Sequence, residues 1–379
     1  MFICLFVVFI VNLQGELKLK IINFDFVKVK VIDNIEDFPQ FEAQNVFQTV
    51  EWMRLFEQEK GTKVVLFAVY SDSTLLLLQP LTINRYYRRI SYKFASYVVA
   101  WREPWRAENI TDEEAINAFR LMTAEIEKYC KKRALYIEYR HFSENNIYAS
   151  IFNSQLSTFN FQLPWYNIYR DFAAGEDVTK QMKRDKKRQL KQSIEAGVEV
   201  VLEPTQEQIV EWYELLKRLY RRIHRPLPSV NVFLRLNKSG IGRLFVVIYK
   251  GRVISGSAML YYINGQQSTV NGFNPLRYVC GRSSRATLQT GGQYEGQRIM
   301  CDSQLFYDWY RASIDLRIEG VYPSVVSTWQ ALQLVADMGG GRFDFMGAGP
   351  QNREYGVRDF KLEFGGELTA EYRYRKYLF

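Results

Sequence analysis

The chain has 379 residues, of which 47% are hydrophobic and 24% are charged, and this composition excludes a disordered or fibrous protein. Its length is sufficient for two ordinary domains, each with its own core. Lys and Arg exceed Asp and Glu by 50 − 41 = 9 charges, which fits a polyanionic partner such as tRNA, a nucleotide-linked sugar or an anionic membrane face. Many basic proteins bind none of these, so charge alone leaves the partner open.

The cysteine and histidine content argues against several kinds of chemistry. None of the four cysteines forms a Cys-x-x-Cys pair, so we expect neither a disulfide framework nor a structural zinc site, and a cytoplasmic location. The two histidines, His141 and His224, have no neighbours that complete a metal-ligand spacing. A lone histidine is more often structural than catalytic. We therefore predict a site that uses no metal, no cofactor and no histidine-activated nucleophile.

The N-terminal 13 residues are almost wholly apolar, like the apolar region of a signal peptide. No Lys or Arg precedes them, however, and no small-x-small cleavage site follows. The stretch is also shorter than the roughly 20 apolar residues of a transmembrane helix. We interpret residues 1–34 as an extension whose status stays open: an unprocessed segment, a start assigned too far upstream, or a membrane anchor.

Residues 35–165 are predicted to form a first domain. Its elements are a helix from Phe47 to about Glu59, paired strands at 63–70 and 74–81, a helix that begins at Thr111 and a strand at 134–139. Thr111 and Glu114 have the spacing of a capping box, in which the threonine accepts from the amide three residues on and the glutamate bonds back.

Residues 166–379 repeat this order and are predicted to form a second domain. Its elements are a basic helix at 180–196, a helix after a second capping box at 205–208, a hairpin of strands at 243–249 and 252–262, a helix at 323–338 and a strand at 342–346. Residues 264–303 show no period and are interpreted as an inserted loop.

The recurrence of helix, hairpin, helix and strand predicts an α/β fold of two tandem acetyltransferase-like (GNAT-like) domains. We expect mixed central sheets flanked by helices, with C-terminal strands that pack back on the first domain. Fold alone does not give function.

The stretch after the last long helix carries the most specific pattern. A glycine cluster at 339–341 ends that helix, a glycine-rich loop follows at 347–350, and Lys361 then lies between Phe360 and Phe364 in what we predict to be a strand. A lysine in so apolar a run is expected to be partly desolvated, and a desolvated cation suits a ligand with a reactive carbonyl or a phosphate.

This pattern resembles the Fem family (FemABX-like) of non-ribosomal peptidyltransferases, and the resemblance covers nearly the whole chain from about Ile35. The segments that carry it are 47–52, 184–197, 307–310, 322–329 and 339–368. Two features depart from the family pattern. The basic helix passes directly into a strand and leaves no room for a coiled-coil arm, and the insertion before Tyr307 puts the shape of the acceptor pocket in doubt.

The resemblance implies that Phe360 and Lys361 contact the aminoacyl end of a donor, with Lys361 stabilising the negative charge that develops as an amine attacks the ester carbonyl. The competing interpretation is that Lys361 is a solvated strand residue. The same resemblance places Arg358, Gly347 and Gly349 near the donor, although Arg358 could equally form a surface ion pair and the glycines a tight turn.

A second group of residues is predicted to bind the acceptor or a phosphate group, and a solvated basic face is the competing interpretation. These residues are Lys183, Lys187, Lys191, Arg221, Arg222 and Gln48.

The function that the resemblance implies is transfer of an amino acid from aminoacyl-tRNA to an amine of a UDP-linked or lipid-linked muropeptide in peptidoglycan synthesis. Such a protein would be a cytoplasmic monomer that contacts the anionic inner face of the membrane. One alternative is a CoA-dependent N-acyltransferase, against which we note that residues 353–358 match the phosphate-cradling pattern of such enzymes only incompletely. Another is a non-enzymatic RNA-binding protein that uses residues 372–377, which read equally well as an edge strand.

Overall fold

A computed structural model describes residues 9–11, 17–19, 27–85, 94–143, 145–153, 160–263, 304–314 and 318–379. The insertion predicted at residues 264–303 lies outside the described residues, and so does most of the apolar N-terminal stretch. Near the N-terminus, strands β1 (Phe9–Val11) and β2 (Leu17–Leu19) pair antiparallel in a small sheet of their own.

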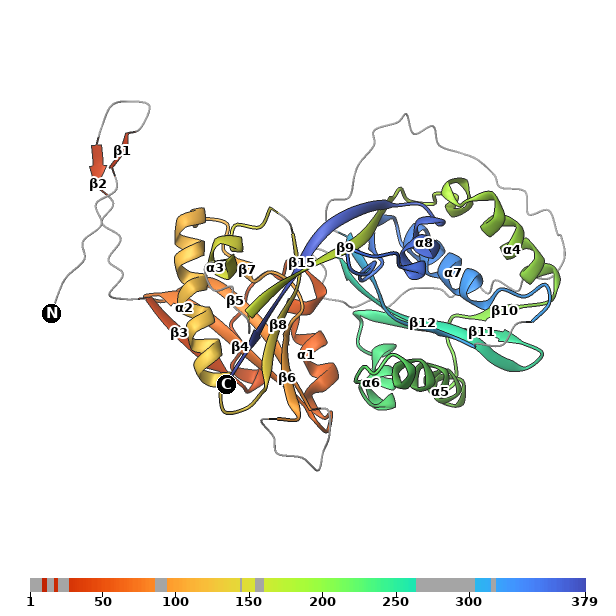
Figure 1. Cartoon of the computed structure of the whole chain (residues 1–379), viewed down its shortest axis with the longest axis horizontal. Coiled ribbons are helices and arrows are strands. Elements are labelled where there is room, and N and C mark those ends of the chain that lie inside the picture. Colours follow the sequence, from red (N-terminus) through yellow and green to blue (C-terminus); the bar gives the residue numbers. More distant parts are fainter. Residues whose placement is uncertain are drawn as a thin grey trace.

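The rest of the molecule is organised around one sheet of thirteen strands, shown in Figure 1. Along the sheet the strands follow the order β10-β11-β12-β13-β14-β9-β15-β8-β6-β5-β4-β3, and the short β7 pairs with β5. The predicted α/β class, with a mixed central sheet flanked by helices, is confirmed.

The first half of the molecule runs from β3 to α3. Its strands are β3 (Val27–Ile32), β4 (Thr62–Ser71), β5 (Thr74–Arg85), β6 (Ser96–Ala100), β7 (Trp105–Arg106) and β8 (Tyr136–Ser143). Its helices are η2 (Ile35–Asp37), η3 (Val46–Gln48), α1 (Val50–Glu57), α2 (Asp112–Cys130) and α3 (Ala149–Asn153). Strands β3 to β6 are antiparallel neighbours, whereas β8 pairs parallel to β6.

The second half runs from η4 to α8 and repeats this arrangement. Its strands are β10 (Glu199–Val201), β11 (Gly242–Tyr249), β12 (Arg252–Ile263), β13 (Gln304–Ser313) and β14 (Gly341–Asp344). Its helices are η4 (Val178–Gln181), α4 (Arg184–Glu195), α5 (Gln206–Arg222), α6 (Val230–Leu236), α7 (Pro323–Asp337) and α8 (Gly356–Leu362). Strands β10 to β13 are antiparallel neighbours, and β14 pairs parallel to β13.

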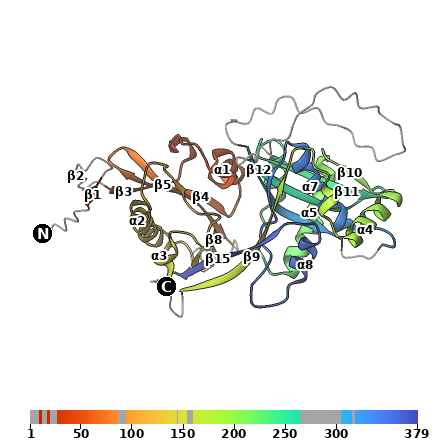
Figure 2. The ribbon, with the colours of Figure 1, turned by 90° about the horizontal axis from the view of Figure 1, so that it is seen from above.

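Two long strands cross between the halves and are called here the crossing strands. They are β9 (Asn160–Phe172), which follows the first half, and β15 (Glu367–Tyr377), which follows the second. β9 pairs with β14 of the second half, β15 pairs with β8 of the first half, and the two pair with each other over ten residues. Figure 2 shows them running side by side from one half to the other.

The crossing strands bear on two predictions from the sequence. Residues 372–377 were predicted to be either an RNA-binding surface or an edge strand, and the edge-strand alternative is wrong because β15 has a hydrogen-bonded neighbour on both sides. The predicted boundary at residue 166 falls within β9, which pairs with elements of the second half, so the domain division stays a prediction.

Local sequence signals explain where several helices begin and end. Both predicted capping boxes are present: Thr111 caps α2 with Glu114, and Thr205 caps α5 with Gln208. The predicted helix before the glycine cluster is α7, and Gly339, Gly340 and Gly341 all have positive φ values of 82° to 128°. Such values are strained for other residues, so the cluster ends the helix.

The segment that carries Lys361 is a helix and not the strand predicted from the sequence. The alternation of Phe360, Leu362 and Phe364 suggested a strand, but a spacing of four residues also matches one helical turn. The rings of Phe360 and Phe364 lie 5.1 Å apart on this turn. Gly365 and Gly366, with φ of 85° and 108°, follow directly and act as a helix stop.

Three large apolar clusters hold the sheet and its helices together. One joins α1 of the first half to α5, α6 and β13 of the second, with Phe56 contacting Trp309 at a ring distance of 6.1 Å. The other two pack α2 and α3 on the first half, and α4, α7 and α8 on the second. The halves therefore share a core as well as the crossing strands. Among the described residues, none of the helices combines the length and apolar character needed to cross a bilayer.

Candidate active site

Lys361 is held by main-chain carbonyl groups in the interior of the second half. Its Nζ donates to Phe345 O at 2.6 Å and to Gly347 O at 2.7 Å. Burial lowers the pKa of Lys361 to about 8, with Asp308 acting to raise it and Arg311 to lower it. An ammonium group has three N–H donors, so one remains after these two bonds.

The ammonium group lies where β13 and β14 diverge. Their parallel pairing ends at Tyr307 opposite Asp344. Beyond this pair β13 continues, whereas the segment after β14 turns away at Met346, whose φ is 56°. β13 also bulges here, because Ala258 and Met259 face Tyr310 and Asp308 and leave the intervening residue unpaired. Diverging strands leave backbone groups and space that a continuous sheet would fill.

Two cavities are lined by residues close to Lys361 in sequence or to the carbonyls that it contacts. The first, called here the α7 cavity, has a volume of about 660 Å³ and is lined by residues of α4, by residues 318–325 and by Phe360. The second, called the junction cleft, has a volume of about 510 Å³, lies between the halves and is lined by Met346, among others. Lys361 itself lines neither cavity, but Phe360, which precedes it, lines the α7 cavity, and Met346, which lies in sequence between the two carbonyls that Lys361 contacts, lines the junction cleft.

The N-terminus of α7 opens into the α7 cavity. Its N-cap residue, Tyr322, makes no side-chain cap, Pro323 is the first helical residue, and the first turn has no acidic residue. Lys186 of α4 lies at the same cavity, 3.0 Å from Glu363 and 4.9 Å from the ring centroid of Phe360. Pro323 has no N–H and the amide of Val325 donates to Tyr322 O at 3.0 Å, so it is the helix dipole and the nearby cation that favour an anionic ligand such as a phosphate.

The incomplete phosphate-cradling pattern at residues 353–358 leads into the short helix α8, whereas the helix whose N-terminus faces a large cavity is α7. The turn before α7 contains Gly320, with φ of 70°, followed by Pro323 at the first helical position. A glycine and then a proline between a strand and a helix is a signal that could have located this turn.

The junction cleft is rich in arginine and aromatic side chains. Its arginines are Arg85, Arg140, Arg225, Arg353 and Arg373, and Glu59 is the only acidic residue among those described as lining it.

Arg373 is the most informative member of this group. It stacks on Trp165 at 4.0 Å, and among the described residues it has no ion-pair partner. Burial, together with the like charge of Arg140, lowers the pKa of Arg373 to about 9. A guanidinium group held without a carboxylate in a basic, aromatic cleft favours a polyanionic ligand with a planar group.

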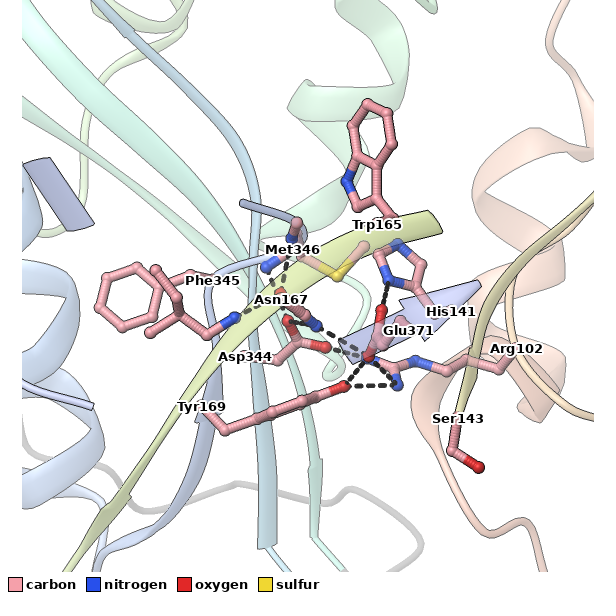
Figure 3. A network of polar contacts seen from close by, with 12 residues as sticks. Arg102, His141, Ser143, Trp165, Asn167, Tyr169, Asp344, Phe345, Met346 and Glu371 are labelled. Atoms are coloured by element: carbon pink, nitrogen blue, oxygen red, sulfur yellow. Dashed lines mark hydrogen bonds and ion pairs between the residues drawn. The ribbon is translucent and has the colours of Figure 1, made fainter. Parts of the chain in front are cut away.

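A buried polar network joins the halves beside the junction cleft (Figure 3). Arg102 of the first half forms an ion pair with Asp344 of the second, and its guanidinium donates to Tyr169 at 3.1 Å. Asn167 donates to Asp344 at 2.8 Å and to Glu371 at 3.1 Å. Glu371 also accepts from Tyr169 and lies 2.8 Å from Nδ1 of His141.

None of the contacts in this network was predicted from the sequence. Its members come from β6's C-terminal loop, β8, β9, β14 and β15, and the pairs are separated by up to 242 residues in sequence. One signal in the sequence could have indicated buried polar contacts. Charged residues such as Glu371 alternate with tyrosines along β15.

The predicted donor-side residues are gathered around one loop. Phe360 lines the α7 cavity, and Gly347 donates its N–H to Asn167 at 2.7 Å while its carbonyl accepts from Lys361. Gly349 has φ of 85°, and a Cβ there would come within 2.3 Å of the Tyr355 ring, so this position requires glycine for packing.

Arg358 also forms hydrogen bonds with the backbone of this loop. It donates to Pro350 O at 3.0 Å and to Arg353 O at 2.6 Å, and its guanidinium lies 5.1 Å from the ring centroid of Tyr166. The alternative ion pair with Asp359 or Glu363 is not formed. Its binding role, like that of the two glycines, stays a prediction.

The predicted basic residues lie outside the cavities described above. Lys183 is the N-cap of α4, Lys187 reaches Lys180 O at 3.4 Å, and Lys191 is 3.7 Å from Glu195. Arg221 and Arg222 are exposed in the last turn of α5, close in sequence to Arg225, which does line the junction cleft. The backbone of Lys183 does meet the end of α8, because its N–H donates to Glu363 O at 2.8 Å, but none of these basic side chains forms a hydrogen bond with Lys361.

Gln48 is buried and lines a third cavity of about 870 Å³, called here the network cavity. This cavity is also lined by Arg102, His141, Tyr169 and Glu371, so Gln48 lies beside the polar network. Its Oε1 accepts from Gln44 N at 2.8 Å and its Nε2 donates to Glu103 O at 3.5 Å. A binding role for Gln48 stays a prediction.

Solved structures share this arrangement, whereas no protein-family model matches the sequence and a search of curated proteins gives no match. A crystal structure of FemX superposes with a TM-score of 0.55 at 13% identity, over 91% of this chain and 94% of that one. A tandem GNAT protein from the clavulanic acid biosynthesis pathway, without AcCoA, gives 0.52 at 8% identity, over 93% and 99%. L-PGS from Bacillus licheniformis gives 0.47 at 9% identity, over 90% and 94%.

The first two similarities establish the fold. They extend over nearly the full length of both chains, so they include both halves and the crossing strands. The FemABX-like, tandem acetyltransferase-like fold predicted from the sequence is therefore confirmed.

Proposed function

We propose that the protein is an acyltransferase that moves an aminoacyl group from an activated ester to an amine on a cell-envelope precursor. One observation carries the proposal: the Lys361 ammonium group lies at the divergence of β13 and β14, next in sequence to Phe360 of the α7 cavity and held by the loop that contains Met346 of the junction cleft. We expect donor and acceptor to bind in these two cavities and to meet at Lys361. FemX, which has the same fold, supports this choice by analogy.

The α7 cavity suits the donor. Its volume, the uncapped N-terminus of α7 and Lys186 favour an anionic carrier, and aminoacyl-tRNA and acyl-CoA both carry phosphates. Phe360 provides an apolar surface at the end nearest Lys361. The exposed lysines of α4, among them Lys183, Lys187 and Lys191, lie on the helix that borders this cavity and would add long-range attraction for RNA.

The junction cleft suits the acceptor. A nucleotide-linked or lipid-linked muropeptide carries phosphates and an amine, and the cleft offers Arg373, Arg225 and stacked aromatic rings. Because Met346 lines this cleft directly next to the carbonyls that hold Lys361, an amine bound here can reach a carbonyl carbon presented from the other side.

Lys361 then acts on the oxygen of the donor ester. The amine nitrogen attacks the carbonyl carbon, a C–N bond forms, and the carbonyl oxygen gains negative charge that the remaining N–H of Lys361 stabilises. The C–O bond to the carrier breaks as the oxygen's electron pair returns. An aminoacyl ester is already activated, so orientation and one placed cation account for most of what is required of the protein.

A CoA-dependent N-acyltransferase is the second candidate. The observation that favours it is the open N-terminus of α7, which would cradle a pyrophosphate as well as an RNA phosphate. The tandem GNAT protein supports it by the same analogy of fold. The two candidates share the chemistry at Lys361 and differ in the carrier.

One experiment separates the candidates. The full chain is incubated with radiolabelled aminoacyl-tRNAs or acetyl-CoA and with nucleotide-linked or lipid-linked muropeptides, alongside Lys361→Ala and the control Lys128→Ala on the exposed face of α2. We expect label to move from tRNA to muropeptide in the wild type and the control but not in Lys361→Ala. Label from acetyl-CoA alone would establish the second candidate, and no transfer from either donor would contradict the proposed function.

A further inference from the structure

His141 adopts an unusual backbone conformation within β8. Its φ is 59°, in the left-handed region that residues with a side chain seldom occupy inside a strand. β8 bulges at this point, because Phe142 faces Tyr372 and Tyr139 faces Tyr374, so that Arg140 and His141 together oppose a single residue of β15. Bulges of this kind redirect a side chain, and conformations that cost roughly 1–3 kcal/mol gather at functional sites.

The side chain of His141 is fixed by Glu371. Nδ1 lies 2.8 Å from Glu371 Oε2, and the two side chains are only 2% and 4% exposed. Burial acts to raise the pKa of Glu371, but His141, Arg102 and the Tyr169 hydroxyl outweigh it and lower the pKa. Glu371 is therefore a carboxylate, which can only accept. The proton of the neutral ring must then be on Nδ1, and the lone pair is on Nε2.

The lone-pair side of the ring has no partner within the protein. Among the described residues, no group forms a hydrogen bond with Nε2. His141 lines both the network cavity and the junction cleft, and its ring lies between Glu371 and Trp165 (Figure 3). Trp165 also lines the junction cleft, so the open side of the ring lies where the acceptor is expected.

The same hydrogen-bonded framework holds His141 and Lys361. Glu371 accepts from Asn167 at 3.1 Å, and Asn167 Oδ1 accepts from the N–H of Gly347 at 2.7 Å. The carbonyl of Gly347 in turn accepts from Lys361 at 2.7 Å. A chain of four hydrogen bonds thus links the Lys361 ammonium group at one end to the His141 ring at the other.

We infer that His141, oriented by Glu371, is the base that removes the proton from the attacking amine in the junction cleft. This inference rests on the proposed function. As the amine nitrogen bonds to the carbonyl carbon, one of its protons passes to Nε2, and Glu371 stabilises the resulting imidazolium. When the C–O bond to the carrier breaks, the proton passes from Nε2 to the leaving oxygen, which departs as a hydroxyl group and restores the neutral ring.

The orientation of the ring can be tested without any substrate. The chain has two histidines, so ¹⁵N-edited NMR of the labelled full-length protein resolves both rings. We expect His141 to be the Nδ1-protonated tautomer at neutral pH and to stay neutral well into the acidic range, because burial lowers its pKa to about 4 against the opposing influence of Glu371. A ring protonated on Nε2 alone would overturn the inference.

The role in transfer is tested with His141→Gly. Glycine accepts a φ of 59° without strain, so this variant keeps the bulge while it opens a ring-sized space beside two cavities. The matched control is His224→Gly, because His224 also has a positive φ of 51° but is exposed at the end of α5. We expect His141→Gly to lower kcat by roughly 10²- to 10⁴-fold with little change in KM, and added imidazole to restore part of it.

The possible outcomes distinguish failure of the base role of His141 from failure of the proposed function. If the wild type transfers label and His141→Gly keeps full activity, or loses it without rescue by imidazole while remaining folded, the inference is wrong and the proposed function stands. If the wild type transfers nothing, the proposed function fails and the base role fails with it. His141→Asn, which also tolerates a left-handed conformation, replaces the glycine variant if thermal unfolding shows that His141→Gly is not folded.

Discussion

Helices α2 and α7 occupy equivalent places in the two halves. Each lies in chain order between two strands that pair parallel to each other, β6 and β8 in one case and β13 and β14 in the other. The N-terminus of α2 is closed by the Thr111–Glu114 capping box and has three acidic residues in its first turn. The N-terminus of α7 has no side-chain cap, no acidic residue in its first turn, and a cavity of about 660 Å³ in front of it.

This difference shows how one structural unit can serve two purposes. A capped, acidic helix start satisfies its own amide groups and repels anions, so α2 contributes to stability. The start of α7 has no acidic residue, so the positive end of its helix dipole faces the α7 cavity without a charge that would repel an anion. Lys361 is likewise found at the divergence of strands in the second half alone.

The largest expected effect concerns the contact that keeps the two halves in a fixed relation. Arg102→Met removes the partner of Asp344 and one neighbour of Glu371, whose side chains are 3% and 4% exposed. Breaking a buried pair by removing one partner costs about 3–5 kcal/mol, because a buried charge is left without compensation. Urea unfolding measures the loss. Arg54→Met, which removes an exposed pair with Glu36 at 3.6 Å, is the control and should change the free energy of unfolding by under about 1 kcal/mol.

If Arg102→Met unfolded with the same free energy as the wild type, the junction would not be held by this network. The two halves would then be joined mainly by the crossing strands and the shared apolar core.

The second effect concerns Lys361, the buried lysine at the divergence of β13 and β14. Lys361→Ala is expected to lower kcat by roughly 10²- to 10³-fold, the cost of removing one donor to a developing oxyanion. The pKa of Lys361 is lowered from 10.5 to about 8, so the ammonium loses its proton as the pH rises through 8, and kcat should fall above that pH. Lys361→Arg should remove this alkaline limb because arginine does not lose its proton there. A wild-type profile that is flat up to pH 10 would argue against a role for the charge.

The third effect tests the helix starts directly. Ser324→Asp places a carboxylate at the second position of α7, the position that Glu113 occupies in α2. We expect KM for the donor to rise about three- to tenfold because a negative charge now faces the α7 cavity. Glu113→Ser makes the reverse change in α2 and should leave KM unaltered. Equal KM values for Ser324→Asp and the wild type would mean that the donor's charge does not bind at this helix.

The sequence predicted those parts of the fold that depend on neighbouring residues. The β11–β12 hairpin, both capping boxes and the end of α7 follow from turn and cap residues close together in the chain. Helix α8 was misassigned because the spacing of Phe360 and Phe364 fits a strand and a helix equally well. The crossing strands depend on pairing between residues about 200 positions apart, which no local pattern reports.

The site was predictable only around Lys361, where the sequence pattern is continuous. His141 was treated as structural because no partner lies near it in sequence, yet Glu371 stands 230 residues away and reaches it across two paired strands. Arg373 and Trp165 meet in the same way across β15 and β9. Chemistry assembled by a folded sheet from distant strands leaves no spacing to recognise.

The smallest expected effect completes the comparison of the two helices. Thr111→Ala removes the side chain that caps α2 and accepts from the amide of Glu114 at 3.2 Å, and it should lower the free energy of unfolding by about 1 kcal/mol. Because no described cavity is lined by Thr111, kcat and KM should not change. Ser324→Asp is expected to do the opposite, raising KM while the unfolding free energy is kept or slightly increased by the helix dipole. If both variants changed stability and neither changed transfer, α7 would be a scaffold helix like α2, and the donor would have to bind elsewhere.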